Sequence, residues 1–183
     1  MIEEFNQLAQ AKFEENKQFL MRLKDKKPKK VDDAFLDHHD DVFIETDCLA
    51  CANCCKTTSP IFMESDIKRI SKYYRMKPSE FISRYLHLDE DNDYVLNSSP
   101  CVFLDADNYC MVYDVRPKAC KEYPHTNRKN MAGLTRITIE NTKVCPAVFE
   151  IVERLKKMKW WVWLFRISYA NIGLKMPLGK VYR

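Results

Sequence analysis

The stretch Cys48-Leu-Ala-Cys51-Ala-Asn-Cys54-Cys55 decides what kind of domain this chain forms, because it concentrates four thiols in one short segment. Thiolates are soft ligands that bind zinc, copper(I) and iron–sulfur clusters, and Cys-x-x-Cys spacing lets neighbouring sulfurs converge on one centre. The chain holds 8 cysteines in 183 residues. The pattern predicts metal ligation by the whole set, which is Cys48, Cys51, Cys54, Cys55, Cys101, Cys110, Cys120 and Cys145.

A disulfide framework is the competing interpretation, because small exported chains often carry many cysteines. The first thirty residues contain no basic start followed by an apolar stretch and a small-residue cleavage site, as an export signal would require. The neighbouring Cys54 and Cys55 would also be awkward disulfide partners for one another. We therefore expect a cytoplasmic protein in which reduced cysteines bind metal.

Length and composition predict one compact domain with an addition at each end. We expect residues 1–45 to form a helical N-terminal extension and an acidic connector, residues 46–158 to form the cysteine-cluster domain, and residues 159–183 to form a basic aromatic tail. Seven acids and no Lys or Arg lie between Asp32 and Asp47, as is typical of a solvated segment. The formal net charge of +4 is modest and gives no clear signal for nucleic-acid binding.

Helical periodicity appears in several places. Apolar residues recur at helical spacing from Ile2 to Leu20, and Ser65 is a suitable N-cap for a helix from Asp66 to Tyr74. Pro78 and Pro146 each stand where a first helical turn is expected, and both are followed by apolar residues at helical spacing.

Short strands are expected between these helices. The segments 94–96, 102–104 and 111–113 are rich in β-formers, and the last two flank the turn-forming residues Asp105 to Asn108. Cys101 and Cys110 would then flank a hairpin, and the alternation from Leu134 to Ile139 predicts a further strand. The expected fold class is α+β: a small mixed domain with short strands, a hairpin and several helices, held together by metal ligands.

These motifs resemble those of the YkgJ-type cysteine-cluster family, which is described as a zinc- or iron-chelating domain. Its Cys-x-x-Cys-x-x-Cys-Cys signature matches residues 48–55, and the second block matches Pro100-Cys101-Val-Phe-Leu and then Cys110-Met-Val-Tyr113-Asp-Val-Arg116-Pro117-Lys-Ala-Cys120-Lys-Glu-Tyr123-Pro124. Cys145 completes the set. The resemblance covers about residues 46 to 150 and implies a cytoplasmic bacterial metal-binding protein.

A more distant resemblance links the cysteine-rich part to flagellin lysine N-methylases, which implies methyl transfer to protein lysine as an alternative activity. The present chain lacks the extra length of those enzymes, and it shows no glycine-rich loop for a nucleotide or a methyl-donor cofactor.

The identity of the metal is left open by the spacing. Cys48, Cys51 and Cys54 follow the three-residue interval of ferredoxin-type loops, and a remote Cys-Pro such as Cys145-Pro146 often completes a [4Fe–4S] site. Zinc needs only four thiolates in a tetrahedral array, so it remains the alternative. Because eight thiolates exceed one mononuclear site, we expect two centres, or one centre with reactive thiols. Cys55 would serve a second centre, remain a redox-active thiol, or simply pack in the core.

Other polar residues are weaker candidates. Arg116 and Tyr113 stand between two cysteines, where Arg116 either compensates thiolate charge or caps a turn, and His125 is a candidate hydrogen-bond donor to a ligand. His38 and His39 could bind a hard metal but are more simply solvated, and nothing supports His87 as a ligand. Tyr123 is expected in the core.

The run Trp160-Trp-Val-Trp-Leu-Phe165 lies among basic residues near the C-terminus. It is too short to span a membrane, so contact with a membrane surface or packing against the domain or a protein partner remain open.

Two functional classes follow. One is a metal carrier, sensor or structural module, and the other is a metal-dependent enzyme with redox or protein-modifying chemistry. We favour the first, because the sequence has no phosphate loop, HExxH helix or Ser-His-Asp order.

Overall fold

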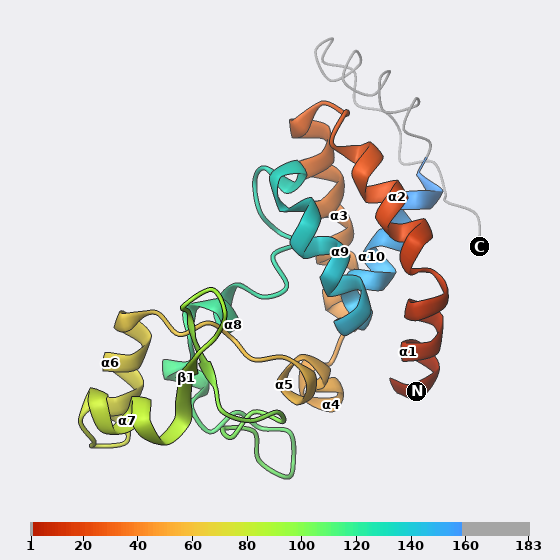
Figure 1. The fold of residues 1–183 in the computed structure, drawn as a ribbon. Coiled ribbons are helices and arrows are strands. Elements are labelled where there is room, and N and C mark those ends of the chain that lie inside the picture. The colour runs from red at the N-terminus through yellow and green to blue at the C-terminus, as the bar shows by residue number, and fades with distance from the viewer. Residues whose placement is uncertain (1, 159–183) are drawn as a thin grey trace.

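The computed structural model describes residues 2–158, and it divides them into two lobes (Figure 1). The helical lobe comprises residues 2–46 and 131–158, whereas the small lobe comprises residues 58–122. Between them lies the cysteine knuckle, residues 47–57, which contains two short helices: α4 (Cys48–Cys51) and α5 (Asn53–Thr57). The expected tail at residues 159–183 lies outside the described residues.

The helical lobe contains five α-helices, among the residues described. Their bounds are α1 (Ile2–Ala11), α2 (Phe13–Leu23), α3 (Pro28–Glu45), α9 (Thr135–Val144) and α10 (Pro146–Lys157), and the short 3-10 helix η2 (Met131–Leu134) precedes α9. The expected N-terminal helix and the helix after Cys145 are confirmed, although the first is divided into α1 and α2 at Lys12.

The core of the helical lobe forms because each helix buries one face. In α10 the buried residues Val148, Ile151, Val152 and Leu155 follow the i, i+3, i+4, i+7 spacing. The apolar residues that form this core are Leu20, Leu23, Val31, Ala34, Phe35, Val42, Met131, Ile139, Ala147, Ile151, Val152 and Leu155.

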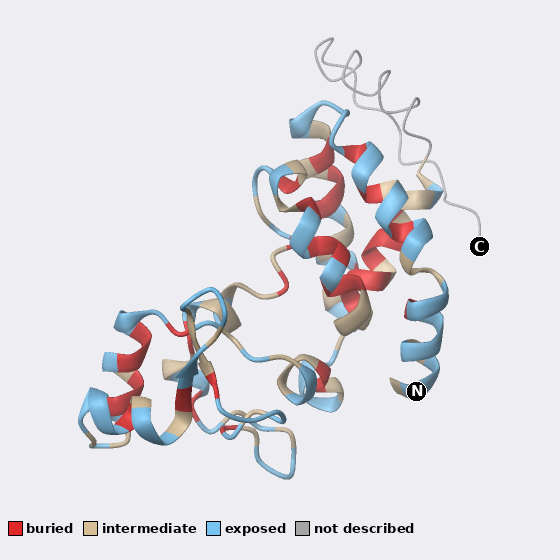
Figure 2. Ribbon diagram, in the orientation of Figure 1, coloured by how far each residue is buried: buried red, intermediate tan, exposed pale blue. Residues whose placement is uncertain are grey.

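The small lobe has its own core (Figure 2). Its elements are α6 (Glu64–Tyr73), α7 (Pro78–Tyr85), β1 (Leu86–Leu88), β2 (Tyr94–Leu96), the 3-10 helix η1 (Tyr113–Val115) and α8 (Lys118–Glu122). β1 and β2 form an antiparallel pair in which Leu86 is opposite Leu96. The core residues are Phe62, Ile67, Ile70, Phe81, Leu86, Leu96, Phe103 and Val112.

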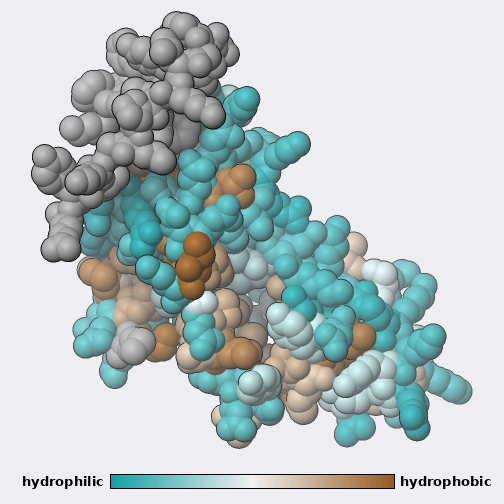
Figure 3. Space-filling model, turned by 180° about the vertical axis from the view of Figure 1, so that it is seen from behind, coloured by the Kyte–Doolittle hydropathy of each residue, from teal (hydrophilic) through white to brown (hydrophobic). Residues whose placement is uncertain are grey.

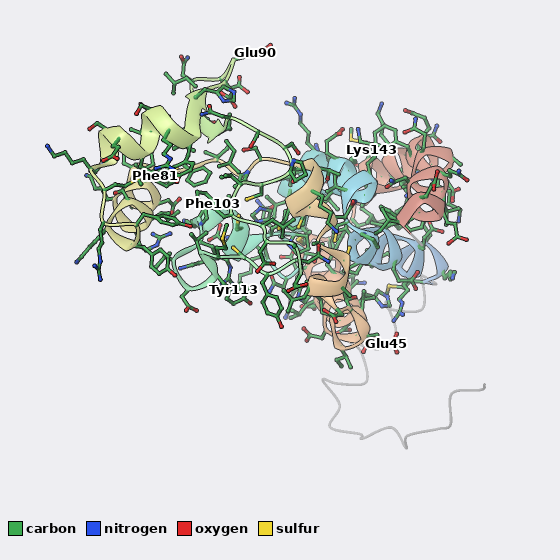
Figure 4. The ribbon with its side chains drawn as sticks, turned by 90° about the horizontal axis from the view of Figure 1, so that it is seen from below. Glu45, Phe81, Glu90, Phe103, Tyr113 and Lys143 are labelled. Atoms are coloured by element: carbon green, nitrogen blue, oxygen red, sulfur yellow. The ribbon has the colours of Figure 1, made fainter. Side chains whose placement is uncertain are left out.

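Aromatic stacking connects the helices of the small lobe to its loops. The rings of Phe81 and Phe103, labelled in Figure 4, lie 6.1 Å apart and are nearly parallel. Because Phe103 follows Cys101 closely, this stack fixes the loop that carries that cysteine against α7.

The α+β fold class is confirmed, as are the helices near Asp66 and Pro78 and the strand at 94–96. The details differ at the start of α6, where Met63 rather than Ser65 occupies the N-cap. The expected hairpin is reduced to one bridge between Leu104 and Cys110, and Tyr113 lies in η1 instead of a strand.

Two further expectations were wrong. The acidic stretch expected as a connector forms most of α3. One face of this helix buries Val31, Ala34, Phe35 and Val42, and the acids lie between these residues in the sequence, so the segment is an amphipathic helix. The predicted strand at 134–139 is instead the start of α9.

The alternation that suggested this strand is misleading because the buried face of α9 is rich in threonine. Thr135, Thr138 and Thr142 are all buried, and the Thr138 hydroxyl donates to the carbonyl of Leu134 at 2.9 Å. Ile137, which belongs to that alternation, is 41% exposed. Tertiary packing thus overrides the local β-preference.

The described part of the chain contains no helix that is both long and apolar enough to cross a membrane. Seen from behind, the surface is largely hydrophilic, with hydrophobic side chains in separate small patches (Figure 3).

Candidate metal centre

The cysteine knuckle is shaped by a cap and a sharp turn. The Asp47 carboxylate accepts hydrogen bonds from the N–H groups of Leu49 and Ala50, at 2.9 and 3.1 Å, and so caps the start of α4. Ala52 then adopts a left-handed conformation with φ of 46° and ends α4. The reversal starts α5 immediately, which packs four cysteines into two single turns of helix.

Cys145 packs against the core of the helical lobe and is coupled electrostatically to three cysteines of the knuckle. We call this set the first group: Cys48, Cys51, Cys54 and Cys145. The Asn53 side chain donates to the carbonyl of Val144 at 2.7 Å. Since Val144 precedes Cys145, this hydrogen bond holds the knuckle next to the junction of α9 and α10.

Electrostatic interactions link the cysteines within the first group and also across the two groups, because the charge of Cys55 acts on Cys48 and that of Cys120 acts on Cys54. Burial raises the pKa of Cys145 to about 11, the N–H groups of Val148 and Ala147 at the start of α10 oppose this rise, and the charges of Cys48 and Cys51 add to it. A metal cation would reverse the repulsion, because it favours the thiolate form of every ligand.

The other four cysteines lie on the side of the small lobe, and we call them the second group: Cys55, Cys101, Cys110 and Cys120. The Cys101 N–H donates to the Cys55 carbonyl at 2.8 Å. The Met111 N–H donates to the Phe103 carbonyl at 2.8 Å, which brings the chain around Cys110 back beside Cys101.

Cys120 lies in α8. Burial, and then the charges of Cys55, Cys101 and Cys110, raise the pKa of its thiol to about 12. The charge of Arg116 acts in the opposite direction on both Cys110 and Cys120.

Cys54 and Cys55 connect the two groups. Their Sγ atoms lie 4.0 Å apart and share a hydrogen bond, which raises the pKa of Cys54 and lowers that of Cys55. The two groups are therefore adjacent.

The ion pair of Asp66 and Arg69, which we call the bracket, positions the segment just before Cys120. Asp66 in α6 is 1% exposed, and its carboxylate accepts a hydrogen bond from the Lys118 N–H at 3.2 Å, at the start of α8. Arg69 pairs with Asp66 at 2.6 Å and donates to the carbonyls of Val115 and Arg116, at 3.1 and 2.8 Å. No local sequence pattern predicts this bracket, because its partners are about fifty residues apart.

Arg116 and Tyr113 interact mainly with each other. The Arg116 guanidinium lies 3.9 Å from the centre of the Tyr113 ring and donates to the Tyr113 carbonyl at 2.7 Å. Arg116 therefore closes the turn before Pro117 while its charge acts on the nearby thiols. Tyr113 itself is 56% exposed.

Tyr123 is closer to the thiols than the sequence suggested. Its buried hydroxyl has no hydrogen-bond partner within the described structure. Burial and then the charges of Cys145, Cys54, Cys51 and Cys55 raise its pKa, so the hydroxyl stays protonated beside the first group.

The histidines are placed differently from one another. His125, in a left-handed conformation, packs against the Tyr123 ring with 6.4 Å between ring centres. His39 shares a 2.7 Å hydrogen bond between Nδ1 and the Thr126 hydroxyl, and both ring nitrogens of His38 are buried without a partner in the described residues. His87 Nδ1 lies 3.2 Å from the side-chain oxygen of Asn97, remote from the knuckle.

The donor set suits a soft metal. All eight thiols are free, and seven are partly buried, whereas Cys48 is exposed. Within residues 2–158, no three His, Cys, Asp or Glu side chains are already arranged to hold a metal ion. The orphaned Tyr123 hydroxyl fits such a centre, because it could donate a hydrogen bond to a thiolate ligand.

Comparison with known proteins agrees with this chemistry. Residues 47–146 match a family model described as "CxxCxxCC: Putative zinc- or iron-chelating domain". Neither the curated proteins nor the solved structures gave a significant match.

Proposed function

Because this chain belongs to the CxxCxxCC family of zinc- or iron-chelating domains, we propose that it binds metal at two neighbouring centres, each with four cysteine ligands. The first group would form one centre and the second group the other. Eight free thiols in two adjacent groups are the observation that carries the proposal.

The division into two groups is supported by hydrogen bonds on either side of Cys54. The Asn53 side chain donates to the carbonyl at the end of α9, whereas the Cys55 carbonyl accepts a hydrogen bond from the Cys101 N–H. The residues on either side of Cys54 are thus attached to different lobes. Cys145 packs against the helical core, and Cys101 and Cys110 pack against the core of the small lobe. Each centre would join the knuckle to one lobe, and each centre needs its sulfurs to turn toward a common point.

The two centres would differ in chemistry. The first has the three-residue spacing and the remote Cys-Pro of a [4Fe–4S] site, so we assign it an iron–sulfur cluster. The second has four thiolates from separate segments, a set that suits one tetrahedral zinc or iron ion. The protein would act as a cytoplasmic metal carrier, sensor or structural module.

The direct test is anaerobic purification followed by analysis of iron, zinc and acid-labile sulfide, with a visible absorption spectrum of the same sample. We expect iron with sulfide and a visible band that bleaches on reduction. Stoichiometric zinc with a featureless spectrum would contradict the cluster assignment, and a sample with no bound metal after reconstitution would contradict metal binding itself.

Single substitutions test whether the eight cysteines are divided between two metal centres. Cys145→Ser should remove the metal of the first centre, Cys120→Ser should remove that of the second, and Ala119→Ser, in the same helix as Cys120, should retain both. If both cysteine variants lose the same metal, the eight thiols serve one shared centre and the division is wrong.

A further inference from the structure

A pocket of about 690 Å³ lies beside the first group. Its walls come from α3, which contributes His39 and Phe43, and from the segment that follows Cys120, which contributes Lys121, Tyr123, Arg128 and Lys129 among others. The volume is within the range of small-molecule sites, about 300 to 1,000 Å³.

The lining of the pocket is positively charged. Glu122 is its one carboxylate, and it is already paired with Arg128 at 2.6 Å and with Lys118 at 3.8 Å. In the part of the chain that the structure describes, Lys121 and Lys129 form no ion pair. Two lysines that form no ion pair among the described residues therefore line one pocket, where their charges favour an anion.

The other lining residues are the aromatic His39, Phe43 and Tyr123, together with Pro124 and the polar Asn127. The His39 and Phe43 rings lie 4.4 Å apart, centre to centre, and Pro124 is buried. Burial lowers the pKa of His39, so at neutral pH its ring presents a neutral surface. A ligand that suits these walls has a planar or apolar body attached to its anionic group.

Tyr123 connects the pocket to the cysteines. Tyr123 lines the pocket, while its hydroxyl is buried and the charges of Cys145, Cys54 and Cys51 raise its pKa. A molecule in the pocket would therefore lie across one aromatic ring from the first group.

We propose that this pocket binds a small organic oxyanion, a carboxylate or a phosphate monoester with an aromatic or apolar body, through Lys121 and Lys129. The site is made by the protein's own side chains, so it does not depend on the metal or on the division of the cysteines. It would place an anionic substrate or effector beside the metal centre.

Isothermal titration calorimetry on the full chain tests this with four probes at fixed ionic strength: phenyl phosphate, benzoate, inorganic phosphate and neutral benzyl alcohol. We expect saturable binding of phenyl phosphate or benzoate at one site per chain, and no binding of benzyl alcohol. Stronger binding of phenyl phosphate would identify a phosphate monoester, and stronger binding of benzoate would identify a carboxylate.

The double variant Lys121→Gln/Lys129→Gln should weaken binding by about tenfold or more, because two charge-assisted contacts are lost. Lys72→Gln/Lys77→Gln makes the same change in net charge on α6 and before α7, and it should bind as the unaltered protein does. Circular dichroism and metal content check that both variants are folded. Equal weakening by the two double variants, or no binding of either aromatic anion, would overturn the proposal.

Discussion

The Asp66 carboxylate lies 2.6 Å from the Arg69 guanidinium, and together these side chains hydrogen-bond to the backbone of three residues just before Cys120: Val115, Arg116 and Lys118. Asp66 is nearly inaccessible, whereas the Arg69 side chain is about one-third exposed. The pair therefore works mainly as a fixed set of donors and acceptors that positions α8.

Asp66→Asn should destabilise the folded protein by about 1–3 kcal/mol, because the buried charge-assisted contacts to Arg69 and Lys118 are weakened. It should also lower metal affinity at the second group by displacing Cys120. Denaturant unfolding and metal titration measure the two effects. Glu64→Gln, at an exposed position of the same helix, is the control and should change stability by less than about 0.5 kcal/mol. Equal effects of the two substitutions would show that the bracket does not position Cys120.

Because Ala52 has a left-handed backbone conformation, we expect glycine to be tolerated at this position and valine to reduce stability. Ala52→Gly should leave stability and metal content nearly unchanged, because glycine adopts φ of 46° without steric cost. Ala52→Val should destabilise the knuckle by about 1–2 kcal/mol or more, since a β-branched residue is disfavoured there. Thermal unfolding and metal content of both variants check this. A valine variant as stable as the glycine variant would contradict a left-handed knuckle.

The Tyr123 hydroxyl should affect the stability of the metal-free protein and that of the metal-loaded protein differently. Tyr123→Phe removes a buried donor that has no partner, so the metal-free protein should be unchanged or more stable by about 1 kcal/mol. The metal-loaded protein should become less stable or shift its visible spectrum, because a hydrogen bond to a thiolate ligand is lost. Melting temperatures of both forms provide the comparison. Identical shifts in the two forms would mean that the hydroxyl does not contact the centre.

Titration of the Glu153 carboxylate on α10 should make the stability of the protein depend on pH. Burial raises its pKa, but hydrogen bonds from Lys12 and Lys156 and the charges of both lysines outweigh this, so the net pKa is below the ordinary 4.5. Because the unfolded chain binds a proton at higher pH than the folded one, the stabilisation is complete above about pH 4.5 and is lost as pH falls through the folded pKa.

Glu153→Gln should therefore reduce stability at neutral pH and flatten the decline in unfolding free energy below about pH 4.5. Denaturant unfolding between pH 3 and pH 7 measures this. Glu140→Gln, whose carboxylate is 57% exposed, should keep the original slope. A variant of Glu153 with an unaltered slope would exclude this carboxylate as the titrating group.

Metal removal should affect the two lobes unequally. Hydrogen exchange after chelation should rise most in residues 47–57 and 101–120, because these segments carry seven of the eight thiols and contain only short helices. The helical lobe should remain protected, since α2, α3, α9 and α10 share an extensive apolar core. Uniform loss of protection in both lobes would show instead that the metal holds the entire fold.

The sequence by itself determined the chemistry of this protein. Thiol spacing over residues 48–55 identified the family and a soft-metal donor set, since ligand type and short-range spacing are local properties of the chain. Helices with regular apolar periodicity, such as α7 and α10, were also predictable, because one buried face appears directly as an i, i+3, i+4 pattern.

Only the tertiary structure decided how these parts are assembled. α9 is a helix despite its alternating sequence because its buried face packs in the helical lobe, where backbone carbonyls accept hydrogen bonds from the buried hydroxyls of Thr138 and Thr142. The acids of α3 face outward because its other face joins the same core. The Asp66–Arg69 bracket and the pocket beside Tyr123 both join segments far apart in the chain. Such contacts depend on how two cores pack around the knuckle, and no local pattern of residues encodes that packing.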